Sequence, residues 1–218
     1  GDLKYDMRFG GLVFHDFGRI RIDARGVKHY NPTFEFIAPA GTRLIAPVSG
    51  VISYFEWQSS QGDWEIHIKP TGDSEWRFGI DHIVSLDCSR STNPDDVCSL
   101  PLKIAGRVLS EGTAVNAGDI IGYIGTWSDY ENIGINGRTE LTIFKYLDGF
   151  TGTMSYCPTM YLGEEVESVF VATISELMQS YEEWSGKAST YDQETMVAPG
   201  CLYEAIKQVG DIPEPITK

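Results

Sequence analysis

The sequence predicts a mainly β protein, an antiparallel open barrel or sandwich with one long and one short α-helix toward the C-terminus. Apolar runs from residue 34 onward are short and are cut by Pro39, Gly41, Pro47 and Gly50, the pattern of strands joined by tight turns. Later runs alternate apolar and polar residues, as half-buried strands do. After residue 150 the apolar residues instead recur at three-four spacing, which indicates a helix.

Residues 1–30 contain turn-rich and strand-like pieces, and the pattern from 34 to 83 is strand, turn and strand throughout. Residues 84–106 interrupt it and are expected to form an insertion loop. The clearest strands are expected at 51–55, 64–69, 76–80, 115–125 and 138–144.

A long amphipathic helix is expected from Glu164 to Trp184, with Gly186 as its stop. Its apolar stripe is expected to pack against the sheet. A shorter helix is expected at 202–208. We therefore expect a β domain at 1–150 and a C-terminal helical extension, 151–218, packed on it.

Composition restricts the partners. The 218 residues can bury one sizeable core. A net charge of −14 argues against nucleic acid and anionic lipid, which need a cationic surface. No apolar stretch approaches the roughly 20 residues of a membrane span. The chain starts at Gly1 without a basic-then-apolar leader, as a mature exported protein does after its signal peptide is removed.

None of the four cysteines forms a C-x-x-C pair, so no zinc knuckle or thioredoxin-like site is expected. Their even count at loop-like positions favours two disulfides and an oxidising compartment, either periplasmic or extracellular. Three pairings are open. We favour Cys88–Cys98, a short ring, and Cys157–Cys201, which would stabilise the chain by about 4 kcal/mol on loop-entropy grounds. The alternative is four buried thiols in a cytosolic protein.

Two blocks carry a family resemblance: Ala38-Pro-Ala-Gly-Thr-Arg-Leu-Ile-Ala-Pro-Val-Ser-Gly-Val51 and Gly112-Thr-Ala-Val-Asn-Ala-Gly-Asp-Ile-Ile-Gly-Tyr-Ile-Gly125. In this order the chain resembles the lysostaphin-type zinc metallopeptidases, which cut peptide cross-links in bacterial cell walls. The similarity spans roughly residues 9–146. It implies the duplicated hybrid motif fold.

The same resemblance implies a substrate cleft lined by Asn31, Glu35, His82, Glu140 and Thr142. The family's zinc-binding H-x-x-x-D corresponds to Asn31 and Glu35, and its late H-x-H corresponds to Glu140 and Thr142. Only His82 keeps a family histidine, so His82 and Glu140 are the candidate catalytic residues. An amide and a hydroxyl are poor zinc donors, so no metal ligand set and no zinc cofactor are expected.

Glu35 and Glu140 would face one small cavity if the family geometry holds. Two close carboxylates do not both stay ionised without cost. They would share a proton, recruit a basic side chain, or bind a hard cation such as Ca²⁺ weakly.

Three function classes follow. The leading hypothesis is a non-catalytic, exported peptidase homologue that binds a peptide, a peptidoglycan fragment or a protein partner in the old active-site groove. The alternative is an active metal-dependent cell-wall endopeptidase, or another hydrolase, with a site rearranged around Glu35, Glu140 and His82. A carrier domain of the biotinyl or lipoyl type needs a hairpin-tip Lys flanked by Met, and no such tripeptide occurs. Neither ligand identity nor oligomeric state follows from the sequence.

Overall fold

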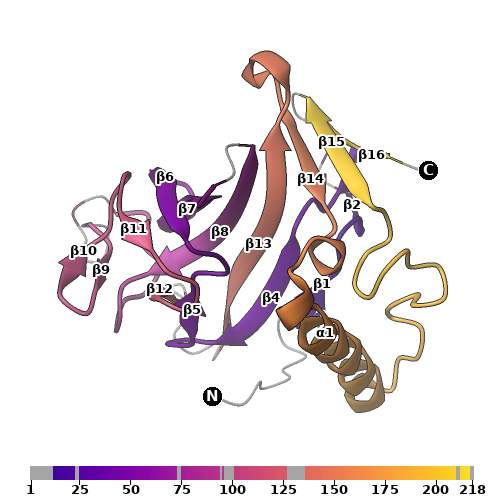
Figure 1. The fold of residues 1–218 in the computed structure, drawn as a ribbon. Coiled ribbons are helices and arrows are strands. Elements are labelled where there is room, and N and C mark those ends of the chain that lie inside the picture. The colour runs from indigo at the N-terminus through magenta and orange to yellow at the C-terminus, as the bar shows by residue number, and fades with distance from the viewer. Residues whose placement is uncertain are drawn as a thin grey trace. The chain divides into compact units, whose positions relative to one another are not determined.

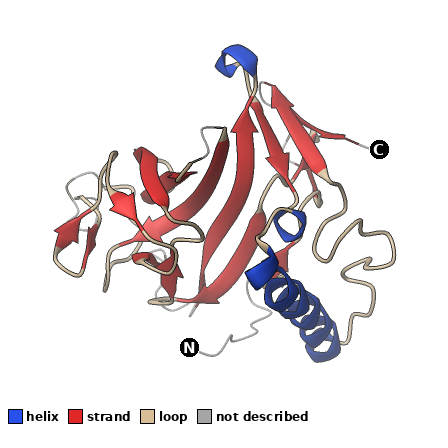
Figure 2. Cartoon of the chain, in the orientation of Figure 1, coloured by secondary structure: helices blue, strands red, loops and turns tan. Residues whose placement is uncertain are grey.

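The computed structural model describes residues 12–22, 25–72, 75–93, 95, 101–126, 136–209 and 212–216. They form two compact units. The first comprises the described residues between Phe36 and Glu140, and the second comprises the described residues within Leu12–Glu35 and Leu141–Lys218. The unit boundaries fall inside β4 (Phe34–Pro39) and β13 (Asn136–Tyr146). Strands dominate both units (Figures 1 and 2), which confirms the mainly β prediction.

The first unit is an antiparallel sheet in the order β11-β6-β7-β8-β13, with β12 paired to both β5 and β8. A separate hairpin joins β9 to β10. The bounds are β5 (Arg43–Ile45), β6 (Gly50–Gln58), β7 (Asp63–Pro70), β8 (Trp76–Val84), β9 (Lys103–Ile104), β10 (Arg107–Val108), β11 (Ala114–Val115) and β12 (Ile120–Ile124).

Alternation along these strands builds the core of the first unit. Ile66 and Ile68 of β7 are fully buried and pack with Ile52 of β6 and Ile83 of β8. Glu65 and His67, which alternate with them in β7, are directed to the opposite face, because successive strand residues point to opposite sides of the sheet. That polar face carries the charged cluster described below.

The second unit continues from β13 in the order β13-β14-β15-β16, all antiparallel, and includes a β2–β3 hairpin and a β1–β4 pairing. Its remaining elements are β1 (Phe14–His15), β2 (Ile20–Ile22), β3 (Lys28–Tyr30), η4 (Asp148–Phe150), β14 (Thr153–Tyr156), η5 (Pro158–Met160), α1 (Glu164–Ser185), β15 (Ala205–Val209) and β16 (Ile212–Ile216).

The long helix α1 confirms its prediction to within one residue and ends at Gly186, which adopts the left-handed conformation. Ile174, Met178 and Tyr181 are its buried face. Val169, near the start of the helix, is 67% exposed and Trp184, at its end, is 43% exposed, so only the middle of the predicted apolar stripe is packed. Among the described residues, no helix is both long and apolar enough to cross a membrane.

The short helix predicted at 202–208 is wrong. Residues Ala205–Val209 form β15, which pairs with β14 on one side and β16 on the other. The segment contains good helix formers such as Ala205 and Lys207, but two ladders of backbone hydrogen bonds and the burial of Ile206 outweigh that weak local preference. The predicted division into 1–150 and 151–218 stays a prediction. Part of the predicted 84–106 loop is ordered as β9.

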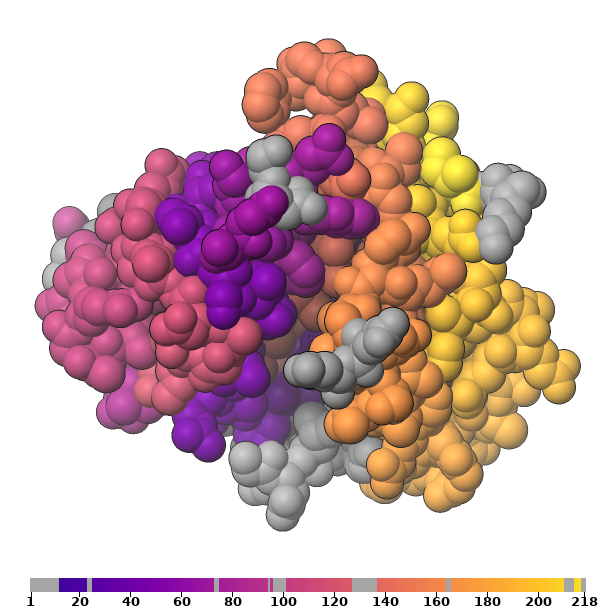
Figure 3. Space-filling view, viewed as in Figure 1, coloured from indigo at the N-terminus to yellow at the C-terminus, as the bar shows by residue number. Residues whose placement is uncertain are grey.

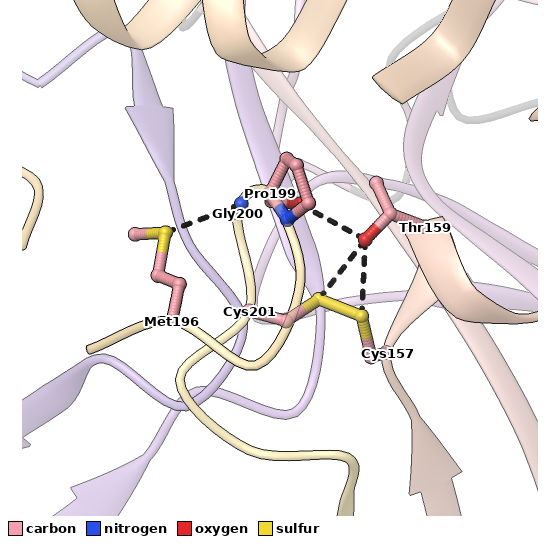
Figure 4. Close-up of a disulfide and its surroundings, with 6 residues drawn as sticks. All are labelled: Cys157, Thr159, Met196, Pro199, Gly200 and Cys201. Atoms are coloured by element: carbon pink, nitrogen blue, oxygen red, sulfur yellow. Dashed lines mark hydrogen bonds between the residues drawn. A yellow bond between two sulfur atoms is a disulfide. The ribbon is translucent and has the colours of Figure 1, made fainter. Parts of the chain in front are cut away.

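The predicted Cys157–Cys201 disulfide is confirmed and lies fully buried in the second unit. Figure 4 shows Thr159 beside both sulfurs, with its hydroxyl donating to the carbonyl of Pro199 at 2.9 Å. The bond ties the end of β14 to the segment before β15. Cys88 is also disulfide-bonded; its predicted partner, Cys98, lies outside the described residues.

Candidate functional site

A β-bulge in β8 creates the local geometry of the site. The β7–β8 register shifts between Trp64 and Ile66, so both Asp81 and His82 lie opposite Glu65. His82 has a φ of 63°, in the left-handed region that non-glycine residues seldom adopt. Bulges re-aim side chains and are common beside functional sites. Here the extra residue brings the side chains of Asp81 and His82 into one cluster.

His82 is the centre of this cluster. Its side chain is 1% exposed, and its Nδ1 lies 2.8 Å from Oδ2 of Asp63, which is fully buried. On the other side of the ring, Nε2 lies 3.4 Å from Oε1 of Glu140 and 3.7 Å from Oδ2 of Asp81. Nε2 has no hydrogen-bond partner of good geometry among the described residues, so these two contacts are electrostatic.

Arg90 contacts the same carboxylate oxygen of Asp63 as His82 does. Its Nε lies 2.7 Å from Asp63 Oδ2 and donates to the carbonyl of Gln61. The loop that carries Arg90 approaches very closely, because a Cβ on Gly62 would lie 2.5 Å from the backbone of Ser91. Gly62 also has a positive φ. The approach of Arg90 to Asp63 therefore depends on a glycine at this position.

The cluster shifts two pKa values. Burial by itself lowers the pKa of His82, but the hydrogen bond to Asp63 and the carboxylates of Glu140 and Asp81 outweigh it and raise the pKa to about 9. Burial raises the pKa of Asp81 to about 6, although the neighbouring His82 lowers it. At neutral pH His82 is therefore an imidazolium, with a proton on both ring nitrogens. In that state it neither accepts a proton nor binds a metal.

This arrangement predicts a pH-dependent stability. The pKa of His82 rises from the ordinary 6.5 to about 9 on folding. Its stabilising contribution is therefore complete below pH 6.5 and is lost as the pH rises through 9. We expect the free energy of unfolding to fall by about 3 kcal/mol over that interval. Urea unfolding at a series of pH values measures this change in the free energy of unfolding. The control is His82→Gln, in which the decrease between pH 6.5 and 9 should be absent. An equal dependence of the free energy of unfolding on pH in both proteins would show that His82 is not its cause.

The predicted cleft residues of the second unit are engaged in structural contacts. The buried amide of Asn31 donates to the carbonyls of Asp16 and Thr33 at 3.1 and 2.9 Å, and its oxygen accepts from the Thr33 hydroxyl. The buried Glu35 pairs with Arg21. Thr142 is half-buried in β13. A bonded neutral amide, an arginine-paired carboxylate and a hydroxyl do not fit a zinc ion.

Of the five predicted cleft residues, the structure brings His82 and Glu140 together in the first unit. Glu35 and Glu140 belong to different units, so their predicted sharing of a proton or a cation stays a prediction. Each has a basic partner within its own unit: Arg21 for Glu35, and His82 for Glu140.

Sequence reasoning missed Asp63, Asp81 and Arg90. Asp63 opens β7 directly after a Gly62 turn, a position where an aspartate is ordinarily a solvated turn residue. Arg90 lies in a loop 27 positions further on. The one available signal was the adjacency of Asp81 to His82. Nothing in the spacing of these residues indicates that Asp63 contacts both Arg90 and the ring of His82.

One group in the described part of the chain could hold a metal ion. Ligand atoms of Asp63, Asp81 and His82 all lie within 4.8 Å of one another. A cation there would have to displace the proton of His82 and compete with Arg90, whose Nε lies against Asp63. No metal site was predicted at these residues.

No family model and no curated protein match the chain. Among solved structures, it is similar to the catalytic domain of a mutant of the prophage-encoded M23 protein EnpA from Enterococcus faecalis, with 20% identity, a TM-score of 0.42, and coverage of 70% of this chain and 95% of that one. The lysostaphin catalytic domain from Staphylococcus simulans gives 18% identity and a TM-score of 0.40, with 66% and 87% covered. LytU gives 23% and 0.39, with 69% and 84% covered.

The first two of these solved structures are an M23 protein and lysostaphin, and the sequence blocks at 38–51 and 112–125 resemble the lysostaphin-type peptidases. Every TM-score is below 0.5 and every identity is below 25%. Function must therefore be argued from the side chains of this chain alone.

Proposed function

We propose that this chain is a non-catalytic, exported relative of the lysostaphin-type peptidases that binds a peptide, a peptidoglycan fragment or a protein partner. The first unit would bind through the polar surface around Asp81, Arg138 and Glu140, which are partly exposed. The single observation that carries the proposal is the state of His82: buried, bonded to Asp63, and protonated at neutral pH.

The reasoning concerns proton transfer. Peptide hydrolysis needs a group that takes a proton from water or stabilises a charged intermediate next to a polarised carbonyl. His82 carries its proton above neutral pH, and its Nδ1 is bonded to Asp63, which also pairs with Arg90. Of the three positions that resemble metal ligands, Asn31 and Thr142 supply no anionic donor, and the carboxylate of Glu35 is paired with Arg21. A surface with charged, partly exposed groups and no activated nucleophile suits binding better than catalysis.

One observation favours the alternative of a metal-dependent hydrolase with a rearranged site. The Asp63, Asp81 and His82 group has the donor types that divalent ions prefer. Under this alternative, loss of the His82 proton would open the group to a cation. The two functions make opposite predictions about metal content and turnover.

The test is a metal and turnover assay on the purified full chain. We expect no stoichiometric transition metal, no hydrolysis of cross-linked peptidoglycan with or without added Zn²⁺, and saturable binding of peptidoglycan fragments. Arg138→Ala is expected to weaken that binding roughly fivefold, since Arg138 is a partly exposed cation beside Glu140. Lys69→Ala is the matched control, because Lys69 is a cation of the same unit on β7 with no contact to the cluster.

One result would reverse the conclusion, and another would narrow the ligand to a protein. Stoichiometric metal together with turnover that is abolished by Glu35→Ala and by His82→Ala would establish a hydrolase. Absence of both turnover and fragment binding would leave a protein ligand, which the same Arg138→Ala and Lys69→Ala pair would test in a cross-linking experiment on the exported fraction.

A further inference from the structure

A concave site lies in the first unit, and none of the residues that line it belongs to the His82 cluster. A cavity of about 460 Å³ lies between the β9–β10 hairpin and β12. Its apolar lining comes from Leu86, Ile104, Ile120 and Tyr123. Leu86, two residues after the end of β8, is 54% exposed. Its volume is within the range of small-ligand pockets, which are mostly apolar with a few placed polar groups.

Two cations border this cavity. Lys103 opens β9 and Arg107 opens β10, and both side chains are exposed. Within the described ranges of the chain, neither makes an ion pair with a carboxylate. The protein has 31 acidic and only 17 basic residues, so two cations without an acidic partner at one cavity are unusual.

Asp119 reduces the net positive charge of the residues that line the cavity. It also borders the cavity, but its Oδ2 accepts from the backbone N–H of Asn116 at 2.8 Å and from the Asn116 side chain at 3.3 Å. Two cations and one carboxylate leave a net charge of +1. A single carboxylate on the ligand matches that charge better than a doubly charged phosphate monoester does.

The β9–β10 hairpin, which carries Lys103 and Arg107, is anchored in the core of the first unit by the residues at its base. Leu102 and Leu109 flank it, are almost fully buried in the core, and close its base with a backbone hydrogen bond of 3.0 Å. At its tip, Ala105 has a φ of 48°, a left-handed conformation that alanine rarely adopts, and Ala105 itself lines the cavity. The hairpin, pink in Figure 3, lies at the surface. Positive φ at both Ala105 and Gly106 is what the tight two-residue turn of this hairpin requires.

We propose that this pocket binds a ligand with an apolar body and one terminal carboxylate, the apolar body lying against Leu86, Ile120 and Tyr123 and the carboxylate between Lys103 and Arg107. Two kinds of molecule combine an apolar body with one terminal carboxylate: a peptide whose C-terminal residue is large and apolar, and a fatty acid. This site is separate from the surface around Glu140, so it stands whether or not the proposed function does.

Isothermal titration of the full chain distinguishes the sources. The probes are acetyl-Leu-Leu with a free carboxylate, the same dipeptide as its C-terminal amide, and decanoate. We expect a carboxylate probe to bind, and acetyl-Leu-Leu to bind about tenfold more tightly than its amide. Tighter binding of acetyl-Leu-Leu than of decanoate identifies a peptide end; the reverse order identifies a fatty acid.

Paired variants test the two cations. The double variant Lys103→Ala/Arg107→Ala is expected to weaken binding about tenfold, and raised ionic strength is expected to weaken the wild type in the same direction. Lys69→Ala should bind as the wild type does. Both substituted side chains are exposed, so folding should be unchanged, and circular dichroism checks this. No binding of either carboxylate, equal binding of the amide, or an unaffected double variant would each overturn the proposal.

Discussion

Replacing Asp63 with Asn is expected to lower the free energy of unfolding by about 3–5 kcal/mol, because it leaves two buried cationic side chains without their anion. Asp63 is fully buried and binds both His82 and Arg90. The substitution keeps the size of the side chain and removes only the charge. Denaturant unfolding followed by tryptophan fluorescence measures the change, and Trp64, adjacent in β7, reports on this unit.

Two controls separate the ion-pair cluster from a general effect of removing an aspartate. Asp87→Asn removes an exposed carboxylate at a position with a φ of 61°, which Asn adopts readily, so it should change stability by less than about 0.5 kcal/mol. In the double variant Asp63→Asn/His82→Gln, the two losses should be less than additive, because each residue is the other's partner. A loss under about 1 kcal/mol in Asp63→Asn, or strict additivity, would show that the cluster is not a buried ion pair.

Removing the Cys157–Cys201 disulfide is expected to lower the free energy of unfolding by about 4 kcal/mol, since the bond closes a long loop in the unfolded chain. The two cysteines are 44 positions apart and lie in the second unit. Circular dichroism at the helical minimum follows this unit, because α1 is the one long helix of the described chain.

The replacement residue matters, because both sulfurs are fully buried. Cys157→Ala/Cys201→Ala removes the cross-link with apolar side chains, and the corresponding double Ser variant adds two hydroxyl groups to a site where Thr159 is the nearest polar side chain. The Ser pair should therefore be at least as destabilised as the Ala pair. An Ala pair as stable as the wild type would show that the cross-link does not limit unfolding of this unit.

The strand pattern was predictable because it is a local property. Alternation of Ile66 and Ile68 with polar neighbours, and the turn residues around Gly41 and Gly50, are visible without any partner strand. The long helix was predictable for the same reason, from the recurrence of Ile174, Met178 and Tyr181. Residues 202–208 were misassigned because their outcome depends on β14 and β16, which lie beside them only after folding.

The candidate site was half predictable. His82 and Glu140 could be singled out by their positions in the motif order, and the structure places their side chains 3.4 Å apart. Their chemistry could not be predicted, because the charge state of His82 depends on its burial and on Asp63, which lies 19 positions before it in the sequence. A sequence shows which groups can titrate, but not which of them are buried together.

By itself, the sequence determined the succession of strands, the long helix, the Cys157–Cys201 pairing as the favoured choice, and the net charge of −14. Only the tertiary structure decided that His82 is an imidazolium that lies between carboxylates. It also decided that the side-chain amide of Asn31 donates hydrogen bonds to backbone carbonyls. Periodicity and composition act over a few neighbouring residues. Burial, and the pKa shifts that follow from it, arise from residues distant in the chain that meet when it folds.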